Sequence, residues 1–165
     1  MRVDALRRVG AIAVLAVLCW LAAPTLVCGQ RAQPMGSASS IPAAALLQPA
    51  ELNQMLHAKS AGRPLVLQVG SRLMFDEAHI QGAEYAGPGS QQSGLTLLRK
   101  RVAALQHGTP IVIYCGCCPW SRCPNMWPAY KELHDLGFTH VRALYIADNF
   151  GTDWVNKGYP VEQSR

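Results

Sequence analysis

Hydrophobic residues beyond residue 40 fall into two patterns, short unbroken runs and positions three or four residues apart. Unbroken runs rich in Leu, Val and Ile are typical of strands buried on both faces of a parallel sheet. Segment 111–114 has this pattern, and segments 64–69 and 141–146 have it with a single interruption, at Gln68 and Arg142. We therefore predict a buried strand in each of them.

Helical spacing appears on either side of these runs. Leu52 and Leu56 follow Pro49, which suits the first turn of a helix. Pro128 lacks the amide hydrogen of a helical hydrogen bond, so the loop before a later helix is expected to extend as far as Trp127. The other predicted helices contain Leu95, Leu98, Val102 and Leu105, then residues 129–134 before Gly137, and finally a short turn around Trp154. Helices that alternate with buried strands predict an α/β fold, with a central parallel sheet flanked by helices on both faces.

The N-terminal segment has the pattern of an export signal. Arg2, Arg7 and Arg8 precede an apolar run over residues 9–23. We predict a secretory signal peptide over residues 1–29, which would make the mature protein periplasmic or secreted. The same segment is about long enough to cross a bilayer. An uncleaved anchor is therefore the alternative, and only then is a membrane contact expected.

Residues 30–40 are rich in Gly, Ser, Ala and Pro, and they predict a flexible linker before a single domain over residues 41–165. Without residues 1–29 the 15 basic and 10 acidic residues fall to 12 and 9, so the net charge becomes +3. The basic run 99–101 lies on a predicted helix, where a solvated surface is its ordinary interpretation. Composition therefore predicts no nucleic-acid partner.

Four of the six cysteines lie within nine residues, at positions 115, 117, 118 and 123. Cysteines crowded into one loop cannot connect distant elements, so we interpret them as functional rather than architectural. Cys115 directly follows the predicted strand 111–114. A thiol at that point is expected to face free backbone N–H groups and the start of a helix, which lower its pKa. On the residues alone, Cys115, Cys117 and Cys118 are equal candidates for a nucleophile.

Several separated segments resemble those of rhodanese-like domains, in an order that agrees from about Ile41 to Glu162. Residues 75–83 resemble the family's acidic segment followed by GHIPGA, the strand running into Cys115 resembles its active-loop junction, and its C-terminal pattern matches at 137–141, Trp154 and 158–161. The resemblance implies a rhodanese-like domain. Among the histidines, we interpret His79 as a structural donor that holds its own loop in place rather than as a metal ligand.

The resemblance further implies a sulfurtransferase or persulfide carrier in which Cys115 carries the sulfane sulfur. The active loop then contains Gly116, Cys117, Cys118, Arg122 and Cys123. Gly116 would let the backbone approach the sulfur anion, and Arg122 would attract an anionic donor such as thiosulfate. The expected partners are a small sulfur-containing anion, a thiol acceptor or the thiol of a partner protein, and no cofactor is expected.

The cysteine cluster leaves two alternatives open. In a thiol/disulfide redox protein, Cys118 or Cys123 would resolve an oxidised or persulfidated Cys115, and a resting disulfide would involve Cys123. In a binding module, the soft thiolates of Cys115, Cys117, Cys118 and Cys123 would hold Cu(I). Phosphatase chemistry is disfavoured, because no cysteine of the loop has the required spacing to Arg122.

Overall fold

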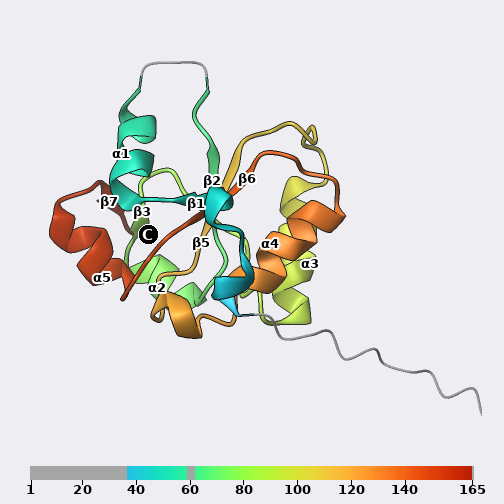
Figure 1. Ribbon diagram of the computed structural model, residues 1–165. Coiled ribbons are helices and arrows are strands. Elements are labelled where there is room, and N and C mark those ends of the chain that lie inside the picture. Colours follow the sequence, from blue (N-terminus) through green and yellow to red (C-terminus); the bar gives the residue numbers. More distant parts are fainter. Residues whose placement is uncertain (1–36, 59–61, 165) are drawn as a thin grey trace, which may run out of the picture. The chain divides into compact units, whose positions relative to one another are not determined.

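The computed structural model describes residues 37–58 and 62–164. A five-stranded parallel sheet with the strand order β1-β6-β5-β2-β4 runs through this domain (Figure 1). Its strands are β1 (Leu46–Leu47), β2 (Leu65–Gln68), β4 (Glu84–Tyr85), β5 (Ile111–Tyr114) and β6 (Val141–Leu144). The three buried strands predicted from the sequence correspond to β2, β5 and β6, and β5 is the central one.

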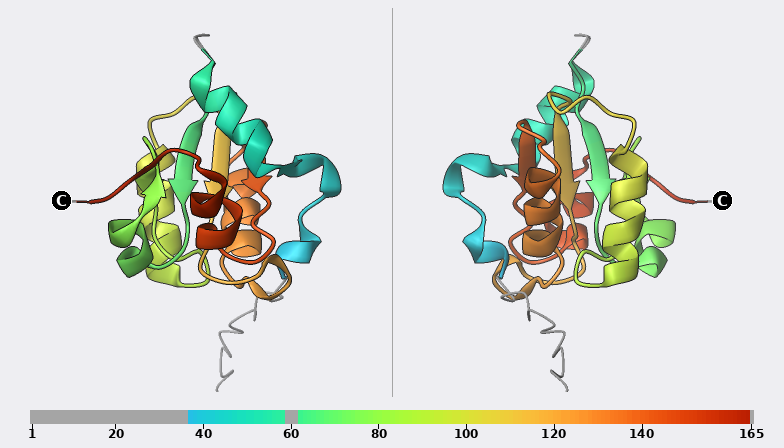
Figure 2. Two further views of the ribbon diagram at one scale, coloured as in Figure 1. Left: turned by 90° about the vertical axis from the view of Figure 1, so that its left-hand side faces the viewer. Right: turned by 90° about the vertical axis from the view of Figure 1, so that its right-hand side faces the viewer.

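Helices cover both faces of the sheet (Figure 2). One face packs against α3 (Gln92–Val102) and α4 (Met126–Asp135). The other face packs against α1 (Pro49–His57), α2 (Arg72–Glu77) and α5 (Phe150–Asp153). Successive residues of β5 alternate between these two buried clusters, as the side chains of an extended strand must. The predicted α/β architecture is therefore confirmed.

The start of α4 differs from the expectation that the loop extends to Trp127. The helix begins at Met126, so Pro128 is its third residue. The first amides of a helix have no acceptor within that helix, so a proline there removes no hydrogen bond. A proline removes a helical hydrogen bond only at positions further along a helix, so Pro128 removes none here.

Two short strands that were not predicted pair outside the main sheet. β3 (His79–Ile80) and β7 (Val161–Glu162) are antiparallel. His79 stacks on the Phe75 ring, and its Nδ1 lies 2.7 Å from the Phe75 carbonyl oxygen. Its Nε2 lies 3.2 Å from Glu162 Oε1, which also accepts a hydrogen bond of 2.8 Å from the Gly82 amide. We call these two strands with Phe75 and Gly82 the clasp. They confirm the structural role predicted for His79.

The packed part of the chain includes the last three residues of the expected linker. Ala38–Ser40 forms a 3-10 turn, and the Ala38 side chain is buried in the core. Residues 30–36 and the predicted signal or anchor over 1–29 lie outside the described residues. In the described part of the chain, no helix combines the length and the apolar character that a membrane crossing requires.

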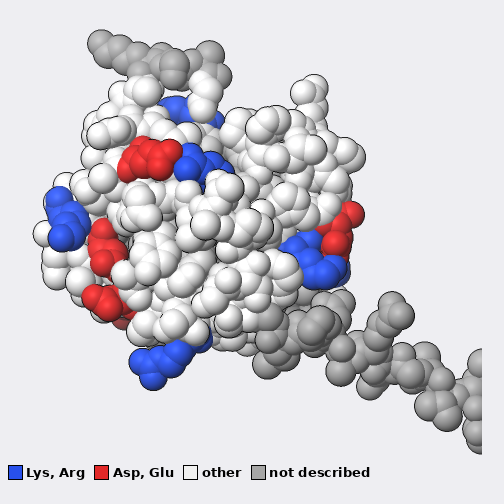
Figure 3. All heavy atoms as spheres, in the orientation of Figure 1, with Lys and Arg blue, Asp and Glu red and all other residues white. Residues whose placement is uncertain are grey.

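Charged side chains lie in small mixed groups on the face shown in Figure 3, with broad uncharged areas between them. Ion pairs among the described residues include Arg142 with Glu51 and Arg99 with Glu132. These pairs join separate elements, since Glu51 lies on α1 and Arg142 on β6.

Candidate functional site

The cysteine loop begins at the carboxyl end of the central strand. β5 ends at Tyr114, and Cys115 is the next residue. The loop then passes through a 3-10 turn, Trp120–Arg122, which is fixed by a hydrogen bond of 3.0 Å from the Trp120 amide to the Ala147 carbonyl oxygen. Ligands bind at the carboxyl ends of strands in sheets of this kind. The predicted position of Cys115 at this end is confirmed.

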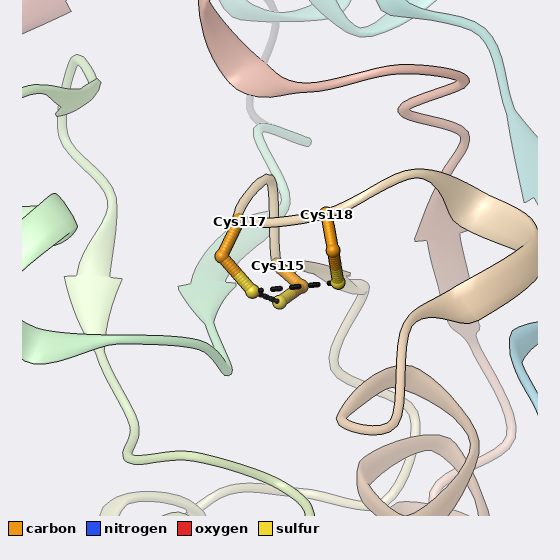
Figure 4. Close-up of side chains that lie close together, drawn as sticks. All are labelled: Cys115, Cys117 and Cys118. Atoms are coloured by element: carbon orange, nitrogen blue, oxygen red, sulfur yellow. Dashed lines mark hydrogen bonds between the residues drawn. The ribbon is translucent and has the colours of Figure 1, made fainter.

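Three sulfur atoms of the loop converge (Figure 4). Cys115 Sγ lies 2.9 Å from Cys117 Sγ, and Cys117 Sγ lies 3.6 Å from Cys118 Sγ. The sulfur atoms of all three residues lie within 4.8 Å of one another. Cys115 is buried with 4% of its surface exposed, whereas Cys117 and Cys118 are partly exposed. With Cys123, which is also buried, they form what we call the sulfur cluster.

A glycine turn folds Cys117 back against Cys115. Gly116 has a φ angle of +75°, a conformation that favours glycine. A side chain at this position would place its Cβ 2.8 Å from the Cβ of Phe150. The Phe150 amide donates a hydrogen bond of 3.0 Å to the Gly116 carbonyl oxygen. Gly116 therefore acts in the loop by shaping the turn that brings the two sulfur atoms together.

Asn125 directs a side-chain donor at this pair of sulfur atoms. Its Oδ1 accepts hydrogen bonds from the Ser90 amide at 3.0 Å and the Ser90 hydroxyl at 2.7 Å. These two donors fix the orientation of the amide, because only the oxygen can accept them. Nδ2 then lies 3.3 Å from Cys115 Sγ and 3.8 Å from Cys117 Sγ. Asn125 is 6% exposed and was not predicted as a site residue.

Gln68 holds the main chain of Cys115 from the neighbouring strand β2. Its Nε2 donates to the Cys115 carbonyl oxygen at 3.3 Å, and its Oε1 accepts from the Gly70 amide at 3.1 Å. The side chain is 2% exposed. Gln68 therefore positions the backbone from which the Cys115 sulfur projects.

Cys115 and Cys117 share a hydrogen bond in which either sulfur can be the donor, and their pKa values are shifted in opposite directions. The hydrogen bond to Cys117, a further one with Cys123, and burial raise the pKa of Cys115. Hydrogen bonds from Cys115 and Cys123 lower the pKa of Cys117 despite its partial burial. The expectation that Cys115 itself has a lowered pKa is therefore wrong. The physical reason is that a neighbouring sulfur takes the negative charge and Cys115 becomes its donor.

The remaining two cysteines differ in their surroundings. Burial raises the pKa of Cys118 to about 12. The backbone amides of Asn125 and Met126, at the start of α4, face the Cys123 sulfur. The main-chain donors that were expected around Cys115 thus lie at Cys123. All four loop cysteines are free thiols, so the expected disulfide of Cys123 is not formed here, and Cys117 is the thiol in contact with Cys115.

A small interior gap of about 10 Å³ lies beside Cys115, which is about enough for one water-sized sphere. Its lining includes Cys115, Cys118, Cys123 and the side chain of Met126. Arg122 is exposed and is not part of this lining. Among the described residues its guanidinium forms no ion pair or hydrogen bond, and its predicted role toward an anionic donor stays a prediction.

Comparison with known proteins reveals a likeness of fold. A crystal structure of the Alr3790 protein from Anabaena sp., which contains a rhodanese-like domain, is 22% identical over 72% of this chain and 92% of that chain, with a TM-score of 0.55. The BH2092 protein from Bacillus halodurans is also 22% identical, over 72% of this chain and 76% of that chain, with a TM-score of 0.55. EanB, in a structure with a cysteine persulfide and ergothioneine, is 17% identical over 71% of this chain and 27% of that chain, with a TM-score of 0.53.

No protein-family model and no curated protein sequence matches the chain. The described domain has the fold of rhodanese-like domains, as the sequence resemblance implied.

Proposed function

We propose that this rhodanese-like fold transfers sulfane sulfur through a persulfide on Cys115. One observation carries the proposal: Cys115 follows the central strand directly, and its sulfur lies 2.9 Å from that of the partly exposed Cys117. The likeness to EanB, whose structure contains a cysteine persulfide, supports the same chemistry. The expected donor is a small sulfur-containing anion such as thiosulfate, and the acceptor is a thiol, free or on a partner protein.

The two close sulfur atoms supply the proton transfer that the reaction needs. They hold one proton between them and titrate as a unit, so moving that proton from Cys115 to Cys117 makes Cys115 the thiolate. Cys115 Sγ then attacks the outer sulfur of thiosulfate. A bond forms between these two sulfur atoms, the S–S bond of thiosulfate breaks, and sulfite leaves with its electron pair. The Asn125 amide, 3.3 Å from Cys115 Sγ, donates to the negative charge throughout.

The gap beside Cys115 suits the product of this step. A persulfide adds one sulfur atom to Cys115, and the neighbouring gap has about the size of one water-sized sphere. Cys118 and Cys123 line it, so their S–H groups can donate to the terminal sulfur. Because Cys115 is 4% exposed, the persulfide is held largely away from water.

Thiosulfate and cyanide test the proposal. We expect thiocyanate from the wild type, and mass spectrometry after thiosulfate treatment should find one added sulfur atom on Cys115. Cys115→Ser should slow thiocyanate formation by about 10³-fold or more. Ser121→Ala, on the exposed part of the same loop, is the matched control and should behave as wild type. A Cys115→Ser variant that takes up sulfur and forms thiocyanate as fast as wild type would exclude the proposal.

A second candidate function is the binding of Cu(I). The observation that favours it is the convergence of the Cys115, Cys117 and Cys118 sulfur atoms within 4.8 Å of one another, since soft thiolates select this ion. Anaerobic titration with Cu(I) and a competing chelator tests it. If the chelator removes the ion at micromolar concentration, this function is wrong.

Export of the protein is also part of the proposal. A secretory signal over residues 1–29 would bring the domain to a compartment where thiols oxidise, so its reduced cluster would need a source of electrons there. Mass spectrometry of the N-terminus of protein from its native host tests this. A chain that keeps residues 1–29 in the cytoplasm would contradict it.

A further inference from the structure

The sulfur of Cys117 is positioned against one particular atom of the proposed persulfide. In a persulfide on Cys115, the inner sulfur is Cys115 Sγ and the outer sulfur is the transferred atom. Attack on the outer sulfur passes the atom onward, whereas attack on the inner sulfur expels it. Cys117 Sγ lies 2.9 Å from Cys115 Sγ. This is at least as close as the separation of about 3–3.5 Å that reacting atoms have just before a bond forms.

The loop holds Cys117 in this place by its backbone. The Gly116 turn has no room for a side chain beside Phe150, and the hydrogen bond from the Phe150 amide fixes the peptide that precedes Cys117. Hydrogen bonds from Cys118 and Cys123 remain available to the Cys117 thiolate after Cys115 has taken up sulfur, as does the more distant Asn125 amide. Cys117 receives a proton during loading, and once it passes that proton to the outer sulfur these donors stabilise its thiolate beside Cys115 Sγ.

We infer that the cluster releases the sulfane sulfur as hydrogen sulfide by forming a Cys115–Cys117 disulfide, a step that rests on the proposed function. The Cys117 thiolate attacks Cys115 Sγ and forms the new S–S bond. The bond between Cys115 Sγ and the outer sulfur breaks, and the outer sulfur leaves as HS⁻ with the electron pair of that bond and the proton that Cys117 has passed to it. Two cysteine sulfurs are oxidised to the disulfide, and the sulfane sulfur is reduced by two electrons.

One turnover of this reaction needs no outside reductant. The next turnover needs a dithiol that reduces the Cys115–Cys117 disulfide by exchange, and Cys117, as the partly exposed sulfur of the pair, is the atom that it reaches. The domain would then couple a dithiol reductant to the reduction of sulfane sulfur. Transfer to an acceptor thiol and release as sulfide become two fates of one persulfide.

A single-turnover experiment tests the inference. Fully reduced protein is mixed anaerobically with thiosulfate and no added thiol, sulfide is trapped and counted, and disulfides are located by peptide mapping. Wild type should release about one sulfide per chain and form the Cys115–Cys117 disulfide. Cys117→Ser should load Cys115 more slowly, keep the persulfide, and release at least about tenfold less sulfide. Ser121→Ala, on the exposed part of the same loop, is the matched control and should release sulfide as wild type does, whereas Cys118→Ser tests whether Cys118 is the attacking thiol instead.

The outcomes separate the inference from the function on which it rests. Wild type that keeps its persulfide without releasing sulfide, or Cys117→Ser that releases as much sulfide as wild type, overturns the inference and leaves persulfide transfer standing. Loss of sulfide in Cys118→Ser with retention in Cys117→Ser also overturns it. Absence of a persulfide on Cys115 in wild type and in folded Cys117→Ser, both without sulfide release, overturns the proposed function as well. Circular dichroism of each variant verifies that it is folded.

Discussion

The sulfur cluster and the clasp each contain a buried polar side chain, Asn125 beside the cluster and His79 in the clasp, yet the two regions use their hydrogen bonds differently. In the clasp, His79 and Glu162 bond to each other and to the backbone of Phe75 and Gly82, so the network closes on itself. In the cluster, Ser90 satisfies only the oxygen of Asn125, and the remaining Nδ2 points at sulfur atoms. The clasp therefore fixes structure, while the cluster keeps donors for a charge that moves during chemistry.

Substitution of one glycine in each region tests the difference between the cluster and the clasp with the largest expected effect on stability. Gly116 in the cluster and Gly82 in the clasp have nearly the same φ angles, +75° and +76°. A Cβ on Gly116 would lie 2.8 Å from Phe150, whereas a Cβ on Gly82 would meet nothing within 4 Å. Gly82→Ala should cost about 1–2 kcal/mol of unfolding free energy from the backbone alone. Gly116→Ala should cost about 2–5 kcal/mol, since overpacking adds to the backbone term.

Urea unfolding of both glycine variants measures this difference. Gly116→Ala should also separate Cys117 from Cys115 and slow sulfur uptake, whereas Gly82→Ala should leave uptake unchanged. Equal losses of stability in the two variants would show that Phe150 does not restrict the loop.

Removal of the clasp histidine should lower stability without changing the chemistry. His79→Ala leaves the Phe75 carbonyl oxygen without its partner, removes the stacked ring and leaves a cavity. We expect a loss of about 3 kcal/mol in unfolding free energy. The rate of thiocyanate formation per folded molecule should match that of wild type, measured well below the unfolding transition. A rate that falls with the stability would mean that the two regions are coupled.

The donor from Asn125 is tested by a substitution that keeps its shape. Asn125→Asp retains an oxygen that accepts from Ser90 but presents a negative charge to Cys115 and Cys117 instead of a donor. Persulfide formation should slow by about 100-fold, as when one donor to a developing anion is removed. The pKa of Cys117 should rise toward its ordinary value. Wild-type rates in Asn125→Asp, confirmed as folded, would contradict this role.

The ionisation order of the thiols predicts a difference in pH dependence. Cys117 has a lowered pKa, so it stays a thiolate as the pH falls from 8 to 6 and its alkylation rate should hardly change. Cys118, with a pKa raised to about 12, loses thiolate at about tenfold per pH unit over the same range. Iodoacetamide at pH 6 should therefore modify Cys117 before Cys118, as peptide mapping can verify. Equal labelling of the two would contradict the assigned order.

The main sheet could be predicted from the sequence because its central strands are mostly apolar runs, unbroken in β5 and interrupted only by Gln68 in β2 and Arg142 in β6. β5 and the position of Cys115 at its end follow from the residues alone. β3, β4 and β7 are two residues long, too short to produce a periodic pattern, and their pairing depends on contacts such as that of His79 with Glu162. A sequence pattern of this kind specifies the layers of the fold better than its connections.

The sulfur cluster was predicted in its composition but not in its electrostatics. The strand and the four cysteines indicate sulfur chemistry, yet the ionisation order depends on sulfur–sulfur distances of 2.9 and 3.6 Å that only the folded loop sets. Asn125 gave no signal, because its role depends on Ser90, 35 residues earlier in the chain. Gln68 was likewise hidden, since it acts through the Cys115 carbonyl group across the strand pairing.

Tyr114 and Cys115 are consecutive residues, and extended backbone sends their side chains into opposite layers. The Tyr114 hydroxyl accepts a hydrogen bond of 3.2 Å from the Ile80 amide of the clasp, while the thiol of the next residue faces Asn125. One peptide unit thus places the phenol and the thiol in different layers, and Phe150, which lies beside Tyr114 and bonds to Gly116, connects the two layers. An engineer who replaces the thiols to install another reaction would therefore have to retain Phe150 and the turn that it fixes.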